Sequence, residues 1–175
     1  TGTVVAAATV GLRYLEGIRK ACIGALIEGE KNPFLVLDVG ANPQPKPQHL
    51  AQFALMGSAY YGCQFGVDAP KVGVLNIGSE DKKGSPLVLE ARRLMQEMPI
   101  AFHGNVEGVE VFSGDCHVVV TDGFSGNVLL KTSEGVAEYL LRTTFKEMAK
   151  VGVPMEQIGA VKKAVLPRVD FSEYR

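Results

Sequence analysis

Lysine and asparagine side chains occur in glycine-containing loops of this chain, where they could hold an anion. Lys82 and Lys83 lie in the loop Gly78-Ser-Glu-Asp-Lys-Lys-Gly84, and Asn127 closes the loop Asp122-Gly-Phe-Ser-Gly-Asn. A lysine ammonium can bind a phosphate or a developing oxyanion. Glycine lets backbone N–H groups turn toward such a ligand. These residue types are typical of a phosphate site that uses one of the two lysines, although lysines in loops are usually only solvated. Asn127 would either face the ligand or only cap the helix that follows it.

Four apolar, strand-like segments of the chain each run into a loop that contains Gly, three of these loops also contain Asn, and a helix-like segment is expected after each loop. When consecutive parallel strands share a sheet, right-handed crossovers bring such loops to one edge. The loops should therefore meet at one crevice. The residues predicted to contact phosphate or substrate there are Gly40, Asn42, Gly78, Gly84, Asn105, Asp122 and Gly126. Asp38 also ends a strand, and a structural role is favoured for it over the orientation of a lysine.

Apolar periodicity, turn residues and helix caps predict the elements between these loops. The third helix has the clearest start, because Ser85 is a good N-cap and Pro86 suits the first helical position. Strands are expected at 23–27, 34–39, 72–77, 101–103 and 117–122, and helices at 3–15, 48–63, 86–98, 127–150 and from 155 onward. Strands that alternate with helices in this way indicate an α/β fold with a mostly parallel sheet.

Composition limits the class of protein. With 175 residues, 46% of them hydrophobic, the chain can bury one sizeable core, so a single α/β domain over residues 1–175 is the expected organisation. The net charge of −1 and the pI near 6.3 argue against nucleic acid as a partner. No apolar run approaches the roughly 20 residues that span a bilayer. The chain has no initiator Met, and we expect it to be the central part of a longer protein.

The cysteines and histidines do not have the spacing of a metal site. The three cysteines are widely separated in apolar or helix-like segments, so we expect buried, reduced thiols and a cytoplasmic location. Among the histidines, only His103 is expected at the crevice, because it ends a predicted strand. The residues concerned are Cys22, Cys63, Cys116, His49, His103 and His117. We predict no metal.

Several enzyme signatures are missing from the sequence. It contains no G-x-S-x-G elbow, no G-x-G-x-x-G and no G-x-x-x-x-G-K-[ST]. The sequence therefore lacks the strongest signatures of serine hydrolases, dinucleotide-binding enzymes and P-loop NTPases. A predicted anion site without a covalent nucleophile suits a reaction in which the bound anion itself attacks.

The loops resemble those of a known family, the phosphate acyltransferases (acyl-ACP:phosphate transacylases), over nearly the whole chain. The order and spacing of several motifs support the resemblance. The matching segments are Leu37-Asp-Val-Gly-Ala-Asn42, Lys46-Pro-x-His-Leu50, Gln52-Phe-Ala-Leu-Met-Gly-Ser58, Val72-Gly-Val-Leu-Asn-Ile-Gly78, Lys83-Gly84, Phe102-x-Gly-Asn-Val-Glu-Gly108, Thr121-Asp-Gly-Phe-Ser-Gly-Asn127 and Leu130-Lys-Thr-x-Glu-Gly135. Thr1-Gly2 and Asp170-Phe-Ser-Glu-Tyr174 are similar to two further family motifs. The family's N-terminal Asp-x-Met-Gly-Gly-Asp loop is absent.

The resemblance implies a three-layer α/β/α fold, related to phosphotransacetylases and isopropylmalate dehydrogenases, in a homodimer. It implies transfer of a fatty acyl group from acyl carrier protein to inorganic phosphate, giving an acyl phosphate for phospholipid synthesis without a cofactor. The family motifs place the catalytic lysine at Lys83 and the catalytic asparagine at Asn127.

Partner surfaces and alternatives remain open at this point. An acidic carrier protein should bind local positive charge. The candidates for this are Arg92, Arg93, Arg142, Lys146 and Lys150, although a solvated helix face also explains the last three. The apolar residues after Pro154 favour core or dimer packing, and they also fit peripheral contact with a membrane surface. Alternative functions are an acyl-CoA phosphotransacetylase and a non-catalytic fragment that dimerises or docks carrier protein. A metal- and NAD-dependent decarboxylating dehydrogenase would need clustered Asp ligands, which the sequence does not show.

Overall fold

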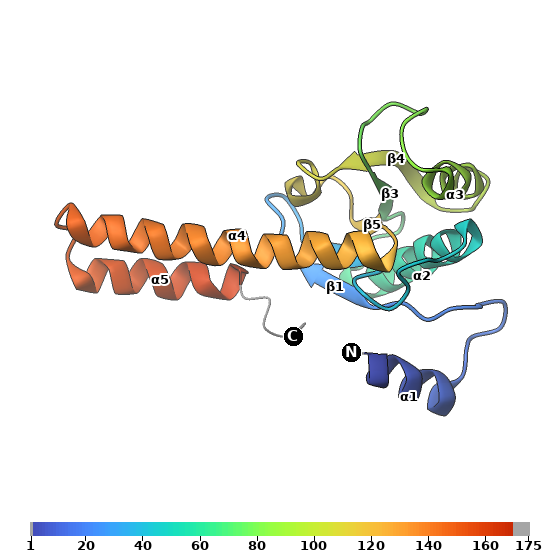
Figure 1. Ribbon diagram of the computed structural model, residues 1–175, viewed down its shortest axis with the longest axis horizontal. Helices are drawn as coiled ribbons and strands as arrows, with labels where there is room; N and C mark the ends of the chain where they lie inside the picture. Colours follow the sequence, from blue (N-terminus) through green and yellow to red (C-terminus); the bar gives the residue numbers. More distant parts are fainter. Residues whose placement is uncertain (1, 170–175) are drawn as a thin grey trace. The chain divides into compact units, whose positions relative to one another are not determined.

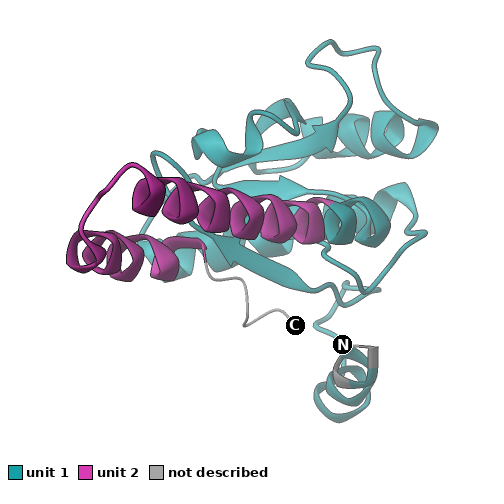
Figure 2. Cartoon of the chain, turned by 60° about the vertical axis from the view of Figure 1, so that its left-hand side comes forward, with its two compact units in different colours: residues 1–128 teal, residues 129–175 magenta. Residues whose placement is uncertain are grey.

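The computed structural model of the chain describes residues 2–169, and Thr1 and the motif Asp170–Tyr174 lie outside this range. The chain forms two compact units, Thr1–Val128 and Leu129–Arg175 (Figure 2). None of the described helices is long and apolar enough to cross a membrane.

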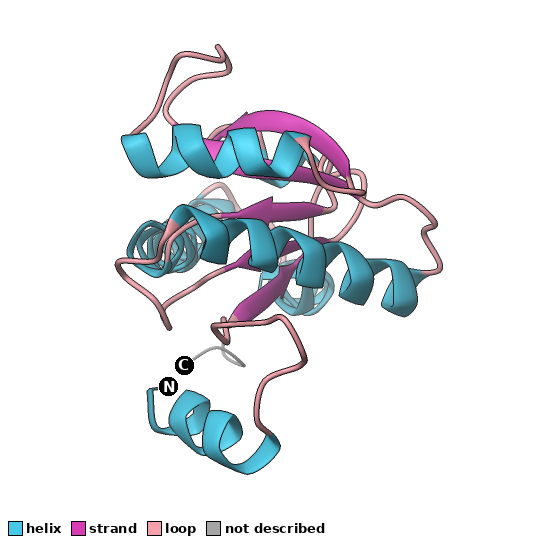
Figure 3. Cartoon of the chain, turned by 90° about the vertical axis from the view of Figure 1, so that its right-hand side faces the viewer, coloured by secondary structure: helices cyan, strands magenta, loops and turns pink. Residues whose placement is uncertain are grey.

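The first unit is built on a five-stranded mixed sheet in the order β1-β2-β5-β3-β4 (Figures 1 and 3). β1 pairs antiparallel with β2, whereas β2, β5, β3 and β4 run parallel to one another. The strands are β1 (Gly24–Ile27), β2 (Phe34–Leu37), β3 (Lys71–Asn76), β4 (Ala101–Glu107) and β5 (Val118–Val120). The predicted α/β class with a mostly parallel sheet is confirmed. Parallel pairing brings the carboxyl ends of four strands to one edge.

Helices α2 (Pro47–Phe65) and α3 (Pro86–Gln96) contact each other and pack on the sheet, α2 over the central strands and α3 over β3 and β4. The core between them is apolar, and β2, β3 and β5 are rich in buried Val and Leu, as expected of strands covered on both faces. Fully buried side chains include Phe34, Leu50, Phe53, Met95, Val72, Val74, Val118 and Val120.

The remaining elements are α1 (Gly2–Leu12), a 3₁₀ turn at Val111–Ser113, α4 (Gly123–Lys150) and α5 (Met155–Val169). In the second unit, α5 runs back alongside the C-terminal part of α4, and Ile158 of α5 is buried (Figures 1 and 2). Many other apolar side chains of this hairpin are exposed.

Two sequence-based expectations about the elements are wrong. The loop expected at Gly104-Asn105 does not exist, because β4 continues through it to Glu107, and only the short turn at Val111–Ser113 follows before β5. His103 is therefore an exposed residue within β4 rather than at a strand end. The last long helix begins at Gly123, four residues before the predicted start at Asn127. Both errors come from reading Gly as a breaker where the backbone continues in regular structure.

Candidate functional site

The loop after β2 is organised around one buried carboxylate. The Asp38 side chain is fully buried and accepts hydrogen bonds from backbone N–H groups of both the loop and the preceding segment. Its Oδ1 accepts from Ile23 (3.1 Å), Gly40 (3.1 Å) and Ala41 (3.0 Å), and its Oδ2 accepts from the Asn42 backbone N–H at 2.7 Å. Both oxygens of this buried carboxylate are therefore supplied with donors from the protein backbone. The geometry supports the structural role favoured for Asp38.

Asn42 completes this arrangement. Its Nδ2 donates to Asp38 Oδ2 at 2.8 Å and to the backbone carbonyl of Ala21 at 2.7 Å, and the side chain is buried. The loop is thereby fixed to the segment that precedes β1. Both N–H groups of the Asn42 amide are used within the protein, so this side chain has no free donor for a phosphate in the described arrangement.

The N-terminus of α4 lies directly on this loop. The Gly123 N–H donates to the Asn42 carbonyl at 2.8 Å, and Asp122 caps the helix, because its Oδ1 accepts from the N–H groups of Phe124 (2.9 Å) and Ser125 (2.8 Å). A Cβ on Gly126 would collide with the Asp38 carbonyl oxygen. Glycine is therefore required for the close approach of this helix to the loop.

Asn127 does not cap the helix, contrary to one of the two sequence interpretations, because Asp122 does so. Its side chain lies next to Gly40: a Cβ built on Gly40 would be 3.7 Å from Asn127 Oδ1. Gly40 has a φ of 138°, a conformation that other residues rarely adopt. The Asn127 side chain is exposed, so it lies at the strand edge with its amide accessible.

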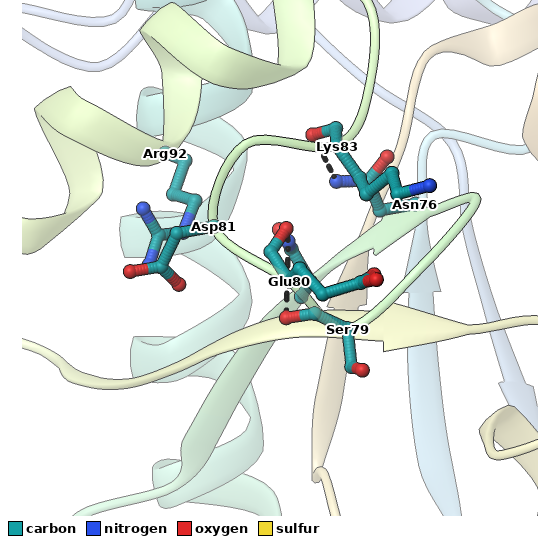
Figure 4. Close-up of polar contacts among 7 residues, drawn as sticks. Asn76, Ser79, Glu80, Asp81, Lys83 and Arg92 are labelled. Atoms are coloured by element: carbon teal, nitrogen blue, oxygen red, sulfur yellow. Dashed lines mark hydrogen bonds and ion pairs between the residues drawn. The ribbon is translucent and has the colours of Figure 1, made fainter.

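The loop after β3 is held mainly by asparagine amides (Figure 4). Asn76, the last residue of β3, donates from Nδ2 to the Lys83 carbonyl at 2.8 Å and accepts from the Ile77 N–H at 2.8 Å. From β4, Asn105 Nδ2 donates to the carbonyl of Glu80 at 2.9 Å. Gly84 closes the loop with a φ of 110°, and a Cβ there would meet the Asn76 amide.

Lys83 projects from this ordered loop as an exposed side chain. Its Cγ lies 3.1 Å from the point where a Cβ on Gly78 would be, so the lysine stem lies against Gly78. Within residues 2–169 neither Lys83 nor Lys82 has an ion-pair partner. An ammonium that no carboxylate neutralises, on a loop fixed at both ends, is available to an anion.

Asn105 was predicted to contact substrate from a loop, and the structure instead places it in β4, buried beneath the loop of β3. Its amide N–H groups are taken by loop carbonyls, and its Oδ1 has no partner among the described residues. In this position Asn105 orders the loop that carries Lys83. Its contact with a ligand stays a prediction.

The predicted site residues thus form two groups at the same edge of the sheet. One comes from β2 and β5, the other from β3 and β4, and no side-chain hydrogen bond joins the two groups in the described part of the chain. β5, which belongs to the first group, is the neighbour of β3, which belongs to the second, so the two groups lie side by side at that edge. The first group is Gly40, Asn42, Asp122, Gly126 and Asn127; the second is Gly78, Lys83, Gly84 and Asn105.

Three of the cations predicted to dock a carrier protein are already engaged. Arg92 is largely buried and pairs with Asp81 of the β3 loop (Figure 4). Arg93 pairs with Glu90 and Glu97 of its own helix, and Lys150 pairs with Glu147. Arg142 and Lys146 are exposed and have no ion-pair partner among the described residues. They belong to the second unit, whereas Arg92 and Arg93 belong to the first.

The cysteines offer no activated thiol in the site. Burial, with a further contribution from the Asp38 carboxylate, raises the pKa of Cys22 to about 12, and burial raises the pKa of Cys116 to about 11. A thiol with such a pKa stays protonated near neutral pH and is a poor nucleophile. Cys63 is exposed, so the expectation of burial is wrong for this residue. The described residues contain no group of three or more His, Cys, Asp or Glu side chains that could hold a metal ion.

Two residues important to the site were not predicted from the sequence. Asn76 and Glu107 end β3 and β4, and both bind the β3 loop, Glu107 through the Ser79 N–H at 3.1 Å. The signal for Asn76 was present in the sequence, since a polar side chain that ends an apolar strand before Gly lies at the carboxyl edge of the sheet. Glu107 lies in a segment that matches the family, but no role was predicted for it, because the strand was expected to end before it.

Together, the fold and this strand edge define an α/β protein with polar, glycine-containing loops at the carboxyl ends of its parallel strands. The family model described as "Fatty acid synthesis protein" matches residues 1–168. The chain belongs to this family.

Curated relatives carry a more specific name. The chain is 41% identical over 179 residues to a phosphate acyltransferase of Clostridium acetobutylicum, covering 99% of this chain and 54% of that protein. It is 44% identical over 181 residues to a phosphate acyltransferase of Myxococcus xanthus, covering 99% of this chain and 51% of that protein. The chain therefore spans about half the length of these relatives.

Among solved structures, EutD phosphotransacetylase from Staphylococcus aureus superposes with a TM-score of 0.58. The match covers 75% of this chain and 46% of that chain, at 22% sequence identity. At this identity the likeness supports the α/β fold alone.

Proposed function

We propose that this chain contributes to the transfer of a fatty acyl group from acyl carrier protein to inorganic phosphate, which forms an acyl phosphate for phospholipid synthesis. The proposal is carried by the exposed Lys83, which has no ion-pair partner among the described residues and lies on an ordered loop of a chain about 40% identical to phosphate acyltransferases. The family supports acyl transfer to phosphate, and the donor and the pathway belong to the proposal.

The chemistry needs positioning and charge stabilisation rather than a covalent nucleophile. A phosphate oxygen attacks the thioester carbonyl carbon, the new carbon–oxygen bond forms, and the carbon–sulfur bond breaks as the thiolate leaves and takes up a proton. Lys83 would hold the phosphate or stabilise the oxyanion of the tetrahedral intermediate. Asn127, beside Gly40, would orient substrate from the neighbouring loop. The other predicted contacts, Gly78, Gly84, Gly126 and Asp122, would shape the edge between them.

The proposal extends to assembly and location. A homodimer is supported by the exposed apolar side chains of α4, among them Val136, Tyr139 and Leu140, which are 50%, 59% and 55% exposed. Val151 and Met155 flank the turn between α4 and α5 and are 78% and 73% exposed, which supports peripheral contact with a membrane surface. We place the protein in the cytoplasm, as a single functional domain that is the central part of a longer acyltransferase.

Release of free carrier-protein thiol from palmitoyl-ACP tests the reaction. The chain is incubated with and without inorganic phosphate, and thiol is measured with a chromogenic disulfide reagent. We expect release only with phosphate, together with a hydroxylamine-sensitive acyl phosphate. A folded chain that releases no thiol from any donor would contradict catalysis and favour a fragment that only dimerises or docks carrier protein.

A second donor separates the main alternative. The phosphotransacetylase neighbour has the same fold, so a small-substrate enzyme that uses acyl-CoA is the competing candidate. Palmitoyl-ACP, palmitoyl-CoA and acetyl-CoA are compared at equal concentrations. The proposed function requires the highest kcat/KM with palmitoyl-ACP, whereas preference for acetyl-CoA would favour the alternative.

A further inference from the structure

A group of basic side chains lies beside the β2 loop, on two segments that are distant in the sequence. Arg19 and Lys20 lie in the connection between α1 and β1, and Lys46 immediately precedes α2. All three side chains are exposed, and none has an ion-pair partner among the described residues. We call these three residues the basic rim.

Hydrogen bonds bring the two parts of the basic rim onto the same end of α2. The Arg19 N–H donates to Gln52 Oε1 at 3.0 Å, and Gln52 Nε2 donates back to the Gly17 carbonyl at 2.7 Å. The Lys46 N–H donates to His49 Nδ1 at 3.1 Å. Since Gln52 and His49 are three residues apart on one helix, they lie on the same face, and the two basic segments are neighbours.

The electrostatics of His49 agree with this placement. Its pKa is lowered, first by burial and then by the positive charges of Lys20, Lys46 and Arg19. No carboxylate contributes to this shift. The first turn of α2 contains no acidic residue either. Among the described residues, no carboxylate forms an ion pair with any of the three side chains of the basic rim.

The basic rim is joined to the candidate site through the next residues of the chain. The carbonyl of Ala21, adjacent to Lys20, accepts from Asn42 Nδ2 at 2.7 Å, and the Ile23 N–H donates to Asp38 Oδ1 at 3.1 Å. The rim therefore lies beside the loop that ends β2, at the edge of the sheet where substrate is proposed to bind. A protein that delivers an acyl group on a flexible prosthetic arm should dock at such a border.

We propose that the basic rim of Arg19, Lys20 and Lys46 is the docking surface for the acidic carrier protein that brings the acyl group. This inference rests on the proposed function, and it replaces Arg92, Arg93 and Lys150 as the main docking residues. Those three are engaged by Asp81, by Glu90 and Glu97, and by Glu147, so their charge is already balanced. An exposed cation that is not already paired can attract an acidic partner without first giving up an existing ion pair.

Charge reversal tests the docking surface by direct binding. Fluorescently labelled carrier protein is titrated with wild type and with Arg19→Glu/Lys20→Glu, at about 0.01 M ionic strength, where charges act over about 30 Å. We expect the Kd to rise about tenfold or more in the double variant. We also expect wild-type binding, but not that of the variant, to weaken steeply as salt is added.

Two matched variants carry the same change in net charge elsewhere. Lys162→Glu/Lys163→Glu alters exposed lysines of α5, and Arg142→Glu/Lys146→Glu alters the docking residues predicted on α4. The Lys162/Lys163 variant should bind close to wild type, and the Arg142/Lys146 variant should lose less affinity than the Arg19/Lys20 variant. Wild-type affinity of the Arg19/Lys20 variant, or an equal loss in either of the other two, would overturn the proposal.

Circular dichroism and urea unfolding establish that each variant is folded. If the charge-reversal variant does not fold, Arg19→Gln/Lys20→Gln takes its place. This neutral variant should still weaken carrier-protein binding severalfold. Phosphate-dependent thiol release from an acyl-pantetheine, which has no protein surface, keeps the two proposals apart. Failure of the acyltransferase proposal would abolish this release in wild type. Failure of the docking proposal would leave it intact while the rim variants bind carrier protein normally.

Discussion

The loops after β2 and β3 end at the same edge of one sheet, and they use their polar groups in different ways. In the β2 loop, Asp38 and Asn42 are buried and bonded to backbone groups of their own loop and of the segment before β1. In the β3 loop, buried Asn76 and Asn105 hold the backbone, and the Lys83 side chain remains exposed. The β2 loop stabilises this edge of the sheet, whereas the β3 loop exposes a positive charge, that of Lys83, at the same edge.

This difference shows how the same residue types at equivalent strand ends can serve separate purposes. A polar side chain whose hydrogen-bonding groups are all bonded within the protein contributes to stability and offers little to a ligand. A cation without a partner contributes little to stability and can bind an anion. Substitutions in the first loop should therefore change unfolding, and substitutions in the second should change turnover.

Asp38→Ala should have the largest effect on stability. It leaves the N–H groups of Ile23, Gly40, Ala41 and Asn42, of which the last is buried, without their acceptor, which we expect to lower the free energy of unfolding by about 4 kcal/mol. Urea unfolding followed by circular dichroism measures this. Asp68→Ala, at an exposed loop aspartate, is the control and should change stability by less than about 0.5 kcal/mol. Equal effects of the two substitutions would refute a special role for Asp38.

Lys83→Ala should have the second largest effect, and this effect should be on the rate of turnover rather than on stability. We expect phosphate-dependent thiol release to fall by about 100-fold, equivalent to about 2.7 kcal/mol of transition-state stabilisation. The urea midpoint should stay at the wild-type value, because the exposed ammonium has no ion-pair partner among the described residues.

Lys82→Ala is the matched control for Lys83→Ala, since it removes the same charge one residue earlier in the same loop. It should retain nearly the wild-type rate. If Lys82→Ala caused the larger loss, the lysine assignment taken from the family resemblance would be wrong. If neither substitution slowed turnover, the loop would not hold the phosphate.

Gly126→Ala tests the close contact between α4 and the β2 loop. The added Cβ would meet the carbonyl oxygen of Asp38 and lie 2.8 Å from the Thr121 methyl group, so we expect a loss of about 2 kcal/mol of stability. Gly135→Ala on the same helix is the control, because its Cβ would meet nothing within 4 Å. It should gain about 0.5 kcal/mol from reduced backbone entropy of the unfolded chain. Stabilisation at both positions would contradict the required close approach.

The sequence predicted most of the fold because the signals were local. Ser85 and Pro86 marked the start of α3, and the Ser85 hydroxyl does accept from the Val88 N–H at 3.4 Å. The parallel arrangement followed from the alternation of strands and helices. The course of β4 could not be predicted, because its pairing with β3 carries the backbone through Gly104, and pairing between distant segments leaves no local signal.

The sequence predicted which residues lie at one edge of the sheet. It did not predict which of their side chains are bonded within the protein and which are free to contact a ligand. Residue types at strand ends placed Asn42, Asp122 and Lys83 at one edge. Whether an amide is free depends on partners distant in sequence, such as the carbonyl of Ala21, 21 residues before Asn42. The basic rim was missed for the same reason, since Lys20 and Lys46 become neighbours only when their segments meet at α2.

The smallest expected effect concerns His117, at the opposite edge of the sheet from both loops. Its Nδ1 accepts from the Lys71 N–H at 2.9 Å, and burial and the charge of Lys71 lower its pKa. The unfolded chain then binds the proton more readily than the folded one, so stability is complete above the unfolded pKa of about 6.5 and falls as the pH drops below it. His49 adds to this loss with the same sign.

Urea midpoints at about pH 7.5 and 5.5 measure the effect of His117 on stability. His117→Gln should lower stability at the higher pH and reduce the difference between the two, because glutamine can accept the Lys71 hydrogen bond at either pH. His103→Gln, at an exposed position within β4, is the control and should leave the urea midpoint at about pH 7.5 close to the wild-type value. If the difference between the two urea midpoints were the same in His117→Gln as in wild type, groups other than His117 would cause the pH dependence. His117 is remote from the carboxyl edge of the sheet. Its substitution should therefore change stability without changing phosphate-dependent thiol release at neutral pH. This result would separate the sheet's contribution to folding from that of either loop.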